Sequence, residues 1–439
     1  MAMGVMSGTG TQDDPFIIED GLDFNALRNI SNNFSSLPSG LEDFQYVELA
    51  NDISLSMFPM FTALPRRAYN IDGKGHMISN INLIAPPPNQ WGERFGSTGL
   101  FQALHVSDYI KDLKLEGTID TMVQMDGMGG NVGTLTQELA LHHSAVISNV
   151  EAYFEIKVEI VDNAISVGGI AGLCSIRTSS NQVRVTECGF KGKITVDSSP
   201  RQPWDTLNNR MGGIFGALVN WETWNGSAAF LQSLTIERCH VEMSIELDPR
   251  WGGQNNIGGI YAATWTNRGN ISPLSINDCV AKIDFRFIHT TSLAANTIVR
   301  IGGIVMNPAT STNSNVTLNR CVAFIDVLWV HTIAVPNFQM AGLLFHGHNA
   351  GQNFTINQGY AVMKMINPNN RPWAGIGANF GSITLLPSTT PNVIVNDAFF
   401  DIDIFEEGFD GAFTITHGVS TAQLKNQSFL EGQGWVFES

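Results

Sequence analysis

Five tryptophans in the middle of the chain have side chains of the kind that carbohydrate-binding sites use. An indole ring has an apolar face that can stack on a sugar ring and an N–H that can donate a hydrogen bond. If neighbouring loops carry these residues, they could form one flank that binds a glycan. Packing within the loops and contact between subunits are the alternative interpretations, because aromatic residues are enriched at protein interfaces. The five residues are Trp204, Trp221, Trp224, Trp251 and Trp265.

Carboxylates cluster near the C-terminal end, and a glycosidase needs two carboxyl groups about 5 to 10 Å apart. Asp401 and Asp403 alternate with Ile402 and Ile404, so the two carboxylates would line the outer face of one strand. We interpret them as a solvated acidic edge that opposes the addition of another strand. The sequence therefore predicts no catalytic residue and a protein that is not an enzyme. The whole cluster is Asp401, Asp403, Glu406, Glu407 and Asp410.

Two histidines are spaced so that they would share one face of an extended segment. His346 and His348 are separated by a single glycine, which places both imidazoles on the same side of a strand. A metal ion would need a third ligand, and the nearby sequence supplies none. His142 and His143 would point to opposite faces. We therefore expect neither a metal site nor a cofactor.

The elements that must position these side chains are most clearly visible in residues 235–247. Apolar residues alternate with polar ones from Cys239 onward, as in a strand with one buried face. The alternation breaks at Glu237 and Arg238, which are adjacent and polar. We interpret this break as a corner between two strands, with both polar residues pointing outward.

The same pattern occurs nine times, which indicates a repeat architecture. Asn and Asp are frequent at the corners, and both tolerate the left-handed backbone region. The positions equivalent to Cys239 are Ile81, Leu113, Val150, Cys188, Cys279, Cys321, Gly359 and Ala398. The corner pairs before these nine positions are Ser79-Asn80, Lys111-Asp112, Ser148-Asn149, Thr186-Glu187, Glu237-Arg238, Asn277-Asp278, Asn319-Arg320, Asn357-Gln358 and Asn396-Asp397.

A Gly-Gly motif lies between successive copies, as in Val167-Gly168-Gly169-Ile170 and Ile257-Gly258-Gly259-Ile260. Glycine permits positive φ and lets a neighbouring backbone come close. We therefore predict a tight bend that leads into a buried strand. Because the pairs precede strands and not helices, they do not form a phosphate-binding loop.

Four of the five cysteines hold the equivalent corner position, namely Cys188, Cys239, Cys279 and Cys321. Stacked copies would place their α-carbons roughly 4.8 Å apart. The stacked side chains would point in parallel, so a disulfide would be strained. We predict a ladder of buried, reduced thiols that act as small hydrophobic residues.

The overall composition excludes some partners. The formal net charge of −16 disfavours nucleic acid and anionic membrane surfaces, which select basic faces. No apolar run reaches the length of about 18 residues that spans a membrane. The N-terminus has no basic and apolar signal sequence. We therefore expect a soluble chain that does not use the usual secretory route.

The two ends differ from the repeated body, and we expect each to cover one end of the stack. Residues 22–30 have the pattern of a short amphipathic helix, and Ser420 with Gln423 forms a capping-box motif. We predict an N-terminal cap and first partial coil over residues 1–68, a parallel β-helix body over 69–404 and a C-terminal cap over 405–439.

The sequence resembles the right-handed parallel β-helix proteins with GLUG-type repeats, over nearly its whole length. The resemblance rests on the Gly-Gly-Ile motifs and on residues 10–16, 51–55, 71–81 and 420–425. It implies an all-β solenoid of about nine coils with short helical caps at both ends. It does not decide the function, because this fold serves several.

Bacterial surface members of this family usually carry export signals and anchoring modules, and the sequence has neither. The resemblance therefore favours a non-enzymatic virion protein of a phage, assembled in the host cytoplasm as a decoration, fibre or tail component. It also implies a homotrimer in contact with other virion proteins. One alternative is a tailspike-like protein that binds a host surface polysaccharide or depolymerises it as a hydrolase or lyase. The other alternative is an extracellular bacterial adhesin.

Overall fold

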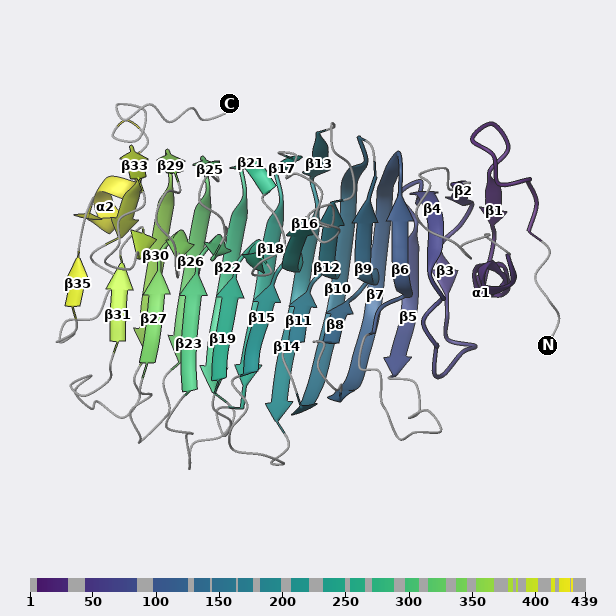
Figure 1. The fold of residues 1–439 in the computed structure, drawn as a ribbon, viewed down its shortest axis with the longest axis horizontal. Helices are drawn as coiled ribbons and strands as arrows, with labels where there is room; N and C mark the ends of the chain where they lie inside the picture. The colour runs from purple at the N-terminus through teal and green to yellow at the C-terminus, as the bar shows by residue number, and fades with distance from the viewer. Residues whose placement is uncertain are drawn as a thin grey trace.

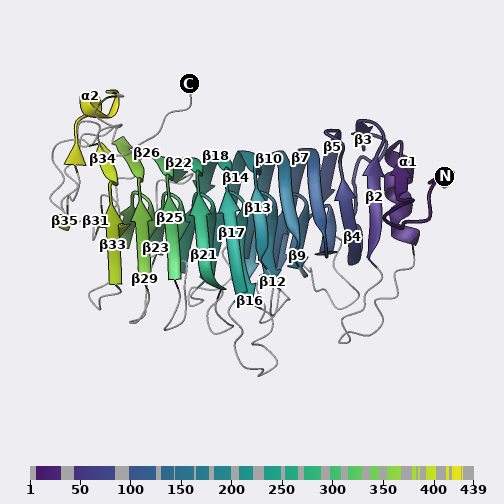
Figure 2. The same ribbon diagram turned by 90° about the horizontal axis from the view of Figure 1, so that it is seen from above.

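The computed structural model shows an elongated stack of β-strands that run side by side along the whole chain (Figure 1). The stack begins at the N-terminal end beside a short helix and ends beside a second short helix, and the view from above shows the same order (Figure 2). The structure describes residues 6–30, 44–84, 98–124, 130–142, 144–162, 165–176, 182–198, 207–220, 232–248, 253–264, 271–287, 297–307, 315–328, 337–345, 353–366, 378–381, 384–385, 392–401, 412–414, 418–426 and 428.

Most coils contribute four strands in a fixed order, whereas in two coils a single long strand, β7 (Tyr109–Gln124) or β10 (Val146–Asp162), runs through the corner. In one four-strand coil the strands are β11 (Ile165–Gly168), β12 (Ala171–Ile176), β13 (Val183–Thr186) and β14 (Gly189–Ser198). Each of them pairs in parallel with its counterpart in the next coil, 44 to 51 residues further along, as Val167 with Met211 and Gly189 with His240 show. This connectivity confirms the predicted all-β parallel β-helix. The right-handed winding and the number of coils stay predictions.

Three ladders of parallel strands therefore run along the rod. The corner ladder holds the strands on both sides of each predicted corner. It comprises β1 (Phe16–Ile18), β2 (Gln45–Leu49), β3 (Ile53–Ser54), β4 (Arg67–Asp72), β5 (Met77–Ile84), β7 (Tyr109–Gln124), β10 (Val146–Asp162), β13, β14, β17 (Gln232–Glu237), β18 (His240–Leu247), β21 (Ile271–Asn277), β22 (Val280–Phe287), β25 (Asn315–Asn319), β26 (Val322–Leu328), β29 (Asn353–Asn357), β30 (Tyr360–Ile366), β33 (Asn392–Asn396), β34 (Phe399–Asp401) and β36 (Gly418–Val419).

The other two ladders hold the strands on either side of the Gly-Gly motifs. The strands before the motif are β8 (Gly130–Gly133), β11, β15 (Leu207–Gly212), β19 (Gly253–Gly258), β23 (Thr297–Gly302), β27 (Asn337–Ala341), β31 (Ala378–Gly381) and β35 (Ala412–Thr414). The strands after it are β6 (Phe101–Val106), β9 (Thr136–Leu141), β12, β16 (Phe215–Asn220), β20 (Tyr261–Thr264), β24 (Val305–Met306), β28 (Leu344–Phe345) and β32 (Thr384–Leu385).

The predicted corners are confirmed at all nine positions. The second residue of every corner pair, from Asn80 to Asp397, has a φ between 50 and 56°. The residue that follows each pair is buried, including Cys239, which is 1% exposed. Backbone hydrogen bonds continue through the corners, because Arg238 N donates to Asn277 O over 2.9 Å and Val280 N donates to Cys239 O over 2.9 Å. The left-handed residue therefore turns the chain without interrupting the ladder.

The Gly-Gly motifs make bends that lead into buried strands, as predicted, but for only one of the two expected reasons. A Cβ on Gly259 would lie 1.9 Å from Gly303 O and 2.4 Å from the Cβ of Ala281, so space demands glycine. The expectation of positive φ is wrong, because Gly168, Gly258 and Gly259 are absent from the left-handed region, where Gly8, Gly10, Gly75 and Gly253 lie. Close backbone approach between coils is the constraint.

The core runs through the inside of the rod from Ile18 to Phe400. The five cysteines are buried and unbridged, which confirms the predicted ladder of reduced thiols. Burial raises the pKa of the Cys188 thiol and raises that of Cys321 to about 12. The Cys321 thiol donates a hydrogen bond to Ile276 O in the preceding coil over 3.4 Å.

Helices lie at both ends of the rod, as expected. Helix α1 (Gly21–Ala26) continues as a 3-10 turn, η1 (Leu27–Asn29), and Asp20 caps it by accepting hydrogen bonds from the backbone of the first turn. Phe24 packs against Phe61 and Phe101, with ring centroids 6.0 and 6.2 Å apart. At the other end, α2 (Thr421–Leu424) begins with the predicted capping box. The three domain boundaries stay predictions.

Candidate functional site

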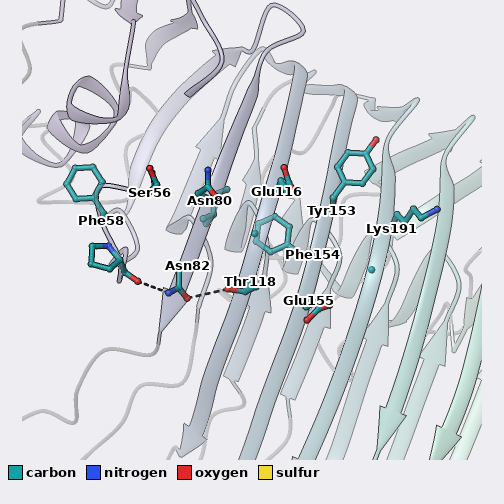
Figure 3. A pocket seen from close by; sticks show the side chains of 14 residues that line it. Ser56, Phe58, Asn80, Asn82, Glu116, Thr118, Tyr153, Phe154, Glu155 and Lys191 are labelled. Carbon is teal, nitrogen blue, oxygen red and sulfur yellow. Dashed lines mark hydrogen bonds between the residues drawn. The ribbon is translucent and has the colours of Figure 1, made fainter. Parts of the chain in front are cut away.

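A shallow groove of about 720 Å³ crosses the outer face of four corner-ladder strands, β5, β7, β10 and β14 (Figure 3). Residues 56–59, which follow β3 in the first partial coil, form its rim. The groove therefore lies where the first partial coil meets the repeated body of the rod. The residues that line it are Ser56, Phe58, Pro59, Asn80, Ile81, Asn82, Glu116, Gly117, Thr118, Tyr153, Phe154, Glu155, Lys191 and Gly192.

The floor of the groove is formed by two glycines on either side of Phe154. Gly117 and Gly192 are the register partners of Phe154 in the strands before and after it. A Cβ on Gly117 would lie 2.1 Å from Ile81 O, and one on Gly192 would lie 1.9 Å from Phe154 O. Glycine is therefore required for the strands to approach so closely, and it leaves bare backbone between the side chains of the walls.

Hydrogen bonds hold the rim against strands β5 and β7. Asn82 Nδ2 donates to Pro59 O over 2.6 Å, and Thr118 Oγ1 donates to Asn82 Oδ1 over 3.3 Å. Phe58 packs edge-on against the buried Phe61, with ring centroids 5.8 Å apart. The rim is therefore preorganised, so that a ligand would not have to order it.

Two aromatic rings flank the groove. Phe58 stands on the rim, and Tyr153 rises from β10 with 37% of its surface exposed. The Tyr153 hydroxyl is hydrogen-bonded to the Glu151 carboxylate, and this bond, together with burial, raises the pKa of Tyr153 to about 12. The phenol therefore stays neutral and holds its ring in place beside the groove.

The groove carries negative charge that is not neutralised within the described residues. Glu116 and Glu155 are exposed, and neither has an ion-pair or hydrogen-bond partner in the part of the chain that is described. Lys191, in contrast, forms an ion pair with Glu242 over 2.8 Å. Two carboxylates, an amide and a hydroxyl thus face outward to accept or donate hydrogen bonds.

This arrangement suits binding better than catalysis. Glu116 is the register partner of Tyr153, and Glu155 is the partner of Thr118, so the two carboxylates lie one strand and two residues apart, about 8 Å between α-carbons. That spacing is compatible with a glycosidase pair. Both groups are open to solvent, however, and an acid catalyst needs a shielded environment that raises its pKa.

The predicted tryptophan site lies outside the described residues. Trp204 and Trp251 belong to segments that join strands of the corner ladder to strands before the Gly-Gly motif. Trp221, Trp224 and Trp265 belong to segments that lead from strands after the motif to the corner ladder. The tryptophan site stays a prediction.

The interpretation of Asp401 as part of a solvated acidic edge is wrong. Asp401 is fully buried and accepts hydrogen bonds from Thr421 Oγ1 over 2.8 and 2.9 Å. The C-terminal helix thus covers a carboxylate that the alternation placed on the outer face. Asp403, Glu406, Glu407 and Asp410 lie outside the described residues.

The histidines have different outcomes. His346, His348 and His143 lie outside the described residues. His142 Nε2 is hydrogen-bonded to Nδ1 of the buried His105 over 2.9 Å, with the rings stacked. Within the described ranges there is no group of three or more His, Cys, Asp or Glu that could hold a metal ion.

Sequence reasoning missed the groove. Alternation alone places Tyr153 and Glu155 on an outer face, but these residues look like ordinary surface. The contact of residues 56–59 with Asn82 creates the hollow, and no spacing in the sequence predicts that contact.

No family model and no curated protein matches the sequence. Among solved structures, a "putative immunoglobulin A1 protease from Bacteroides ovatus" is similar at 15% sequence identity and a TM-score of 0.45, over 80% of this chain and 86% of that chain. No helix among the described residues is long and apolar enough to cross a membrane.

Proposed function

We propose that the chain is a non-enzymatic structural component of a phage particle, a decoration, fibre or tail protein displayed as an oligomeric β-helical rod. The observation that supports this proposal is the continuous corner ladder from β1 to β36. Within it the strands of successive coils pair in parallel from one end of the rod to the other, and a helix lies at each end. Such a body resists proteases and separation of its strands.

Mass spectrometry of purified particles tests this proposal. We expect peptides of the chain in the particles at a stoichiometric level, and antibody labelling on their surface. Absence from the particles would remove the virion role. Light scattering after size-exclusion chromatography tests the trimer, which has three times the chain mass of 47.8 kDa.

The groove supports a second candidate function, the binding of a host surface glycan. Phe58 and Tyr153 offer ring faces, and Asn82, Thr118 and Glu155 offer polar atoms between them. Carbohydrate sites are commonly shallow and combine these two kinds of contact. In this function the rod would be the scaffold, and the lateral groove would make the attachment.

Titration of host surface polysaccharide tests the groove. We expect Tyr153→Ala and Glu155→Gln each to weaken binding at least tenfold. Glu159→Gln, on the same strand and outside the groove, is the matched control and should bind as the unchanged chain does. Equal binding by all variants would exclude the groove, and loss of binding in Trp204→Ala or Trp251→Ala instead would favour the tryptophan site.

The same experiment tests the non-enzymatic part of the proposal. Release of reducing ends would indicate a hydrolase, and release of unsaturated sugars would indicate a lyase. Either product, formed in proportion to the amount of protein, would show that the chain is an enzyme and overturn the non-enzymatic part of the proposal.

A further inference from the structure

The ladder of strands before the Gly-Gly motif differs in charge from the rest of the chain. Its eight strands, β8, β11, β15, β19, β23, β27, β31 and β35, contain two arginines and no Asp, Glu, Lys or His. The whole chain has 40 Asp and Glu against 24 Lys and Arg, so carboxylates would be expected to outnumber arginines here as well. These strands therefore carry a positive surface on an acidic protein.

The two arginines lie in one row on the outer face of this ladder. By register, Asn256 lies between Arg210 and Arg300. Gln339 is the partner of Arg300 in the following coil. Strands β15, β19, β23 and β27 run side by side (Figure 1), with neighbouring α-carbons about 4.8 Å apart. Because successive side chains alternate between the faces of a strand, the row points outward, opposite to the core residues Met211, Ile257, Ile301 and Met340.

Amide groups hold the Arg300 guanidinium from two sides. Arg300 Nε donates to Gln339 Oε1 over 3.0 Å, and Arg300 Nη1 donates to Gln254 Oε1 over 2.7 Å. The guanidinium carbon lies 6.0 Å from the centroid of the Phe345 ring, within the range of a cation–π contact. These contacts orient the guanidinium and leave N–H donors on Nη1 and Nη2 for a ligand.

The charge of Arg300 is not neutralised within the described residues. Its hydrogen bonds there go to neutral amides, and it forms no ion pair with a carboxylate. Arg300 is partly buried, and burial lowers its pKa below the ordinary value. A charge that is removed from water without a counter-charge lowers stability. An anion from outside the chain would supply this counter-charge.

Asn256 adds the need for a hydrogen-bond donor beside this anion. The residue is 4% exposed, and its Nδ2 donates to Asn208 Oδ1 over 2.5 Å. Its Oδ1 is buried and has no hydrogen-bond partner in the described part of the chain. A buried acceptor without a partner is unfavourable. A ligand that satisfies both residues must offer acceptors to Arg300 and a donor to Asn256.

A sugar acid meets both needs. Its carboxylate can accept two parallel hydrogen bonds from a guanidinium, and a hydroxyl on the same ring can donate a hydrogen bond. An ionised Asp or Glu side chain of another protein offers only acceptors, so it would leave Asn256 Oδ1 unsatisfied.

We propose that the arginine site binds a uronic acid residue of an acidic polysaccharide, with the carboxylate on Arg300 and a hydroxyl on Asn256. The arginine site consists of Gln254, Asn256, Arg300 and Gln339. It lies on a different ladder from the groove, so it does not depend on the glycan binding proposed there.

Calorimetric titration of the full chain with trigalacturonate tests the arginine site. Two matched probes separate its requirements. Galactotriose is the neutral sugar of the same length, and tricarballylate has the same number of carboxylates but no hydroxyl. We expect both probes to bind at least about tenfold more weakly than trigalacturonate, because each lacks one kind of hydrogen bond. Equal binding of either probe, or no binding of trigalacturonate, would overturn the proposal.

Variants locate the bound sugar. Gln339→Glu places a carboxylate next to Arg300 within the chain, so we expect trigalacturonate binding to fall at least about tenfold while the Tm stays the same or rises. Arg300→Lys keeps the charge but loses the planar fork, and it should also weaken binding. Arg320→Gln is the matched control, because Arg320 is bonded to Asp278 on the corner ladder, and it should bind as the unchanged chain does.

The variants also separate this site from the groove. Unchanged binding in both Gln339→Glu and Arg300→Lys would place the sugar elsewhere and overturn the arginine site. If Tyr153→Ala then weakened binding of the same sugar, the groove would be its site. Loss of binding in Gln339→Glu and Arg300→Lys, with unchanged binding in Tyr153→Ala, would support the arginine site alone.

Discussion

Asn319 and Asn357 hold the same corner position in successive coils, and Asn357 Nδ2 donates a hydrogen bond to Asn319 Oδ1 over 2.8 Å. The ladder continues in both directions, to Asn277 over 2.6 Å and from Asn396 over 2.9 Å. Each amide donates to the coil before it and accepts from the coil after it. The side chains thus extend the hydrogen bonding of the backbone at the corner, where the chain turns.

Replacement of one rung should weaken two coils together. Asn357→Ala removes the bond to Asn319 and the bond from Asn396, so we expect the free energy of unfolding to fall by about 2 kcal/mol, at about 1 kcal/mol for each bond. Thr355→Ala, two residues earlier on the outward face of β29, is the matched control and should cost less than about 1 kcal/mol. Urea unfolding of the variants measures both. Equal losses would show that the amide ladder does not stabilise the corner.

The close approach at the Gly-Gly bends predicts strong destabilisation by a single methyl group. In Gly259→Ala the new Cβ would meet the backbone of Gly303, which cannot move without shifting the next coil. We expect a loss of about 3 kcal/mol or more in stability. Gly75→Asn is the control, because Gly75 has a φ of 83° and no atom within 4 Å of its added Cβ, and Asn tolerates that conformation. A soluble, fully stable Gly259→Ala chain would contradict the steric argument.

The left-handed corners predict a dependence on the shape of the side chain. Arg238 has a φ of 52° and forms an ion pair with Glu187 over 2.9 Å. Arg238→Asn and Arg238→Val both remove this ion pair, so the difference between them isolates the backbone. We expect the valine variant to be less stable by about 1 to 2 kcal/mol, because a β-branched residue is strained in this region. Thermal unfolding of the two variants measures this difference. Equal stability would mean that the backbone at the corner relaxes to accept valine.

Asp72 predicts a dependence of stability on pH. Burial alone would raise the pKa of Asp72, but the backbone N–H of Lys74 and the ammonium groups of Lys111 and Lys74 together hold it below the ordinary value. A lowered pKa in the folded chain stabilises it above the unfolded value of about 3.9, and this contribution is lost as the pH falls through the folded pKa.

Asp72→Asn measures this contribution. At pH 7 we expect a loss of about 2 kcal/mol, because hydrogen bonds to a charged group disappear. The gap between the variant and the unchanged chain should narrow as the pH falls below about 4. A gap that is constant from pH 7 to pH 3 would mean that the charge of Asp72 makes no contribution.

The thiol ladder predicts that the cysteines are unreactive in the folded chain. All five cysteines are buried, so a reagent does not reach them in the folded chain. Burial also raises the pKa of Cys321 to about 12, which disfavours the reactive thiolate there. We expect a thiol reagent at pH 8 to modify none of the five cysteines until denaturant is added, and then to modify all five. Rapid labelling of the folded chain would show that a thiol is accessible.

The sequence predicted the coil better than the site because the coil depends on neighbouring residues. The break at Glu237 and Arg238 marks a corner, since alternation and a left-handed residue act over a few positions. The same locality misled the interpretation of Asp401. The outward direction of the Asp401 side chain was predicted. Its burial, however, depends on Thr421, twenty residues later, and on how the C-terminal helix folds back.

By itself, the sequence determined the repeat: its nine corners, its Gly-Gly bends, its buried thiols and its helical ends. These features follow from a period of two and from steric limits on single residues, which every coil repeats. Only the tertiary structure decided where the outer face becomes hollow or apolar. The groove needs residues 56–59 to fold over Asn82, and the apolar part of the outer face needs Phe324 to come into register with Val362 of the next coil. Loop lengths between coils set these contacts, and no local preference encodes them.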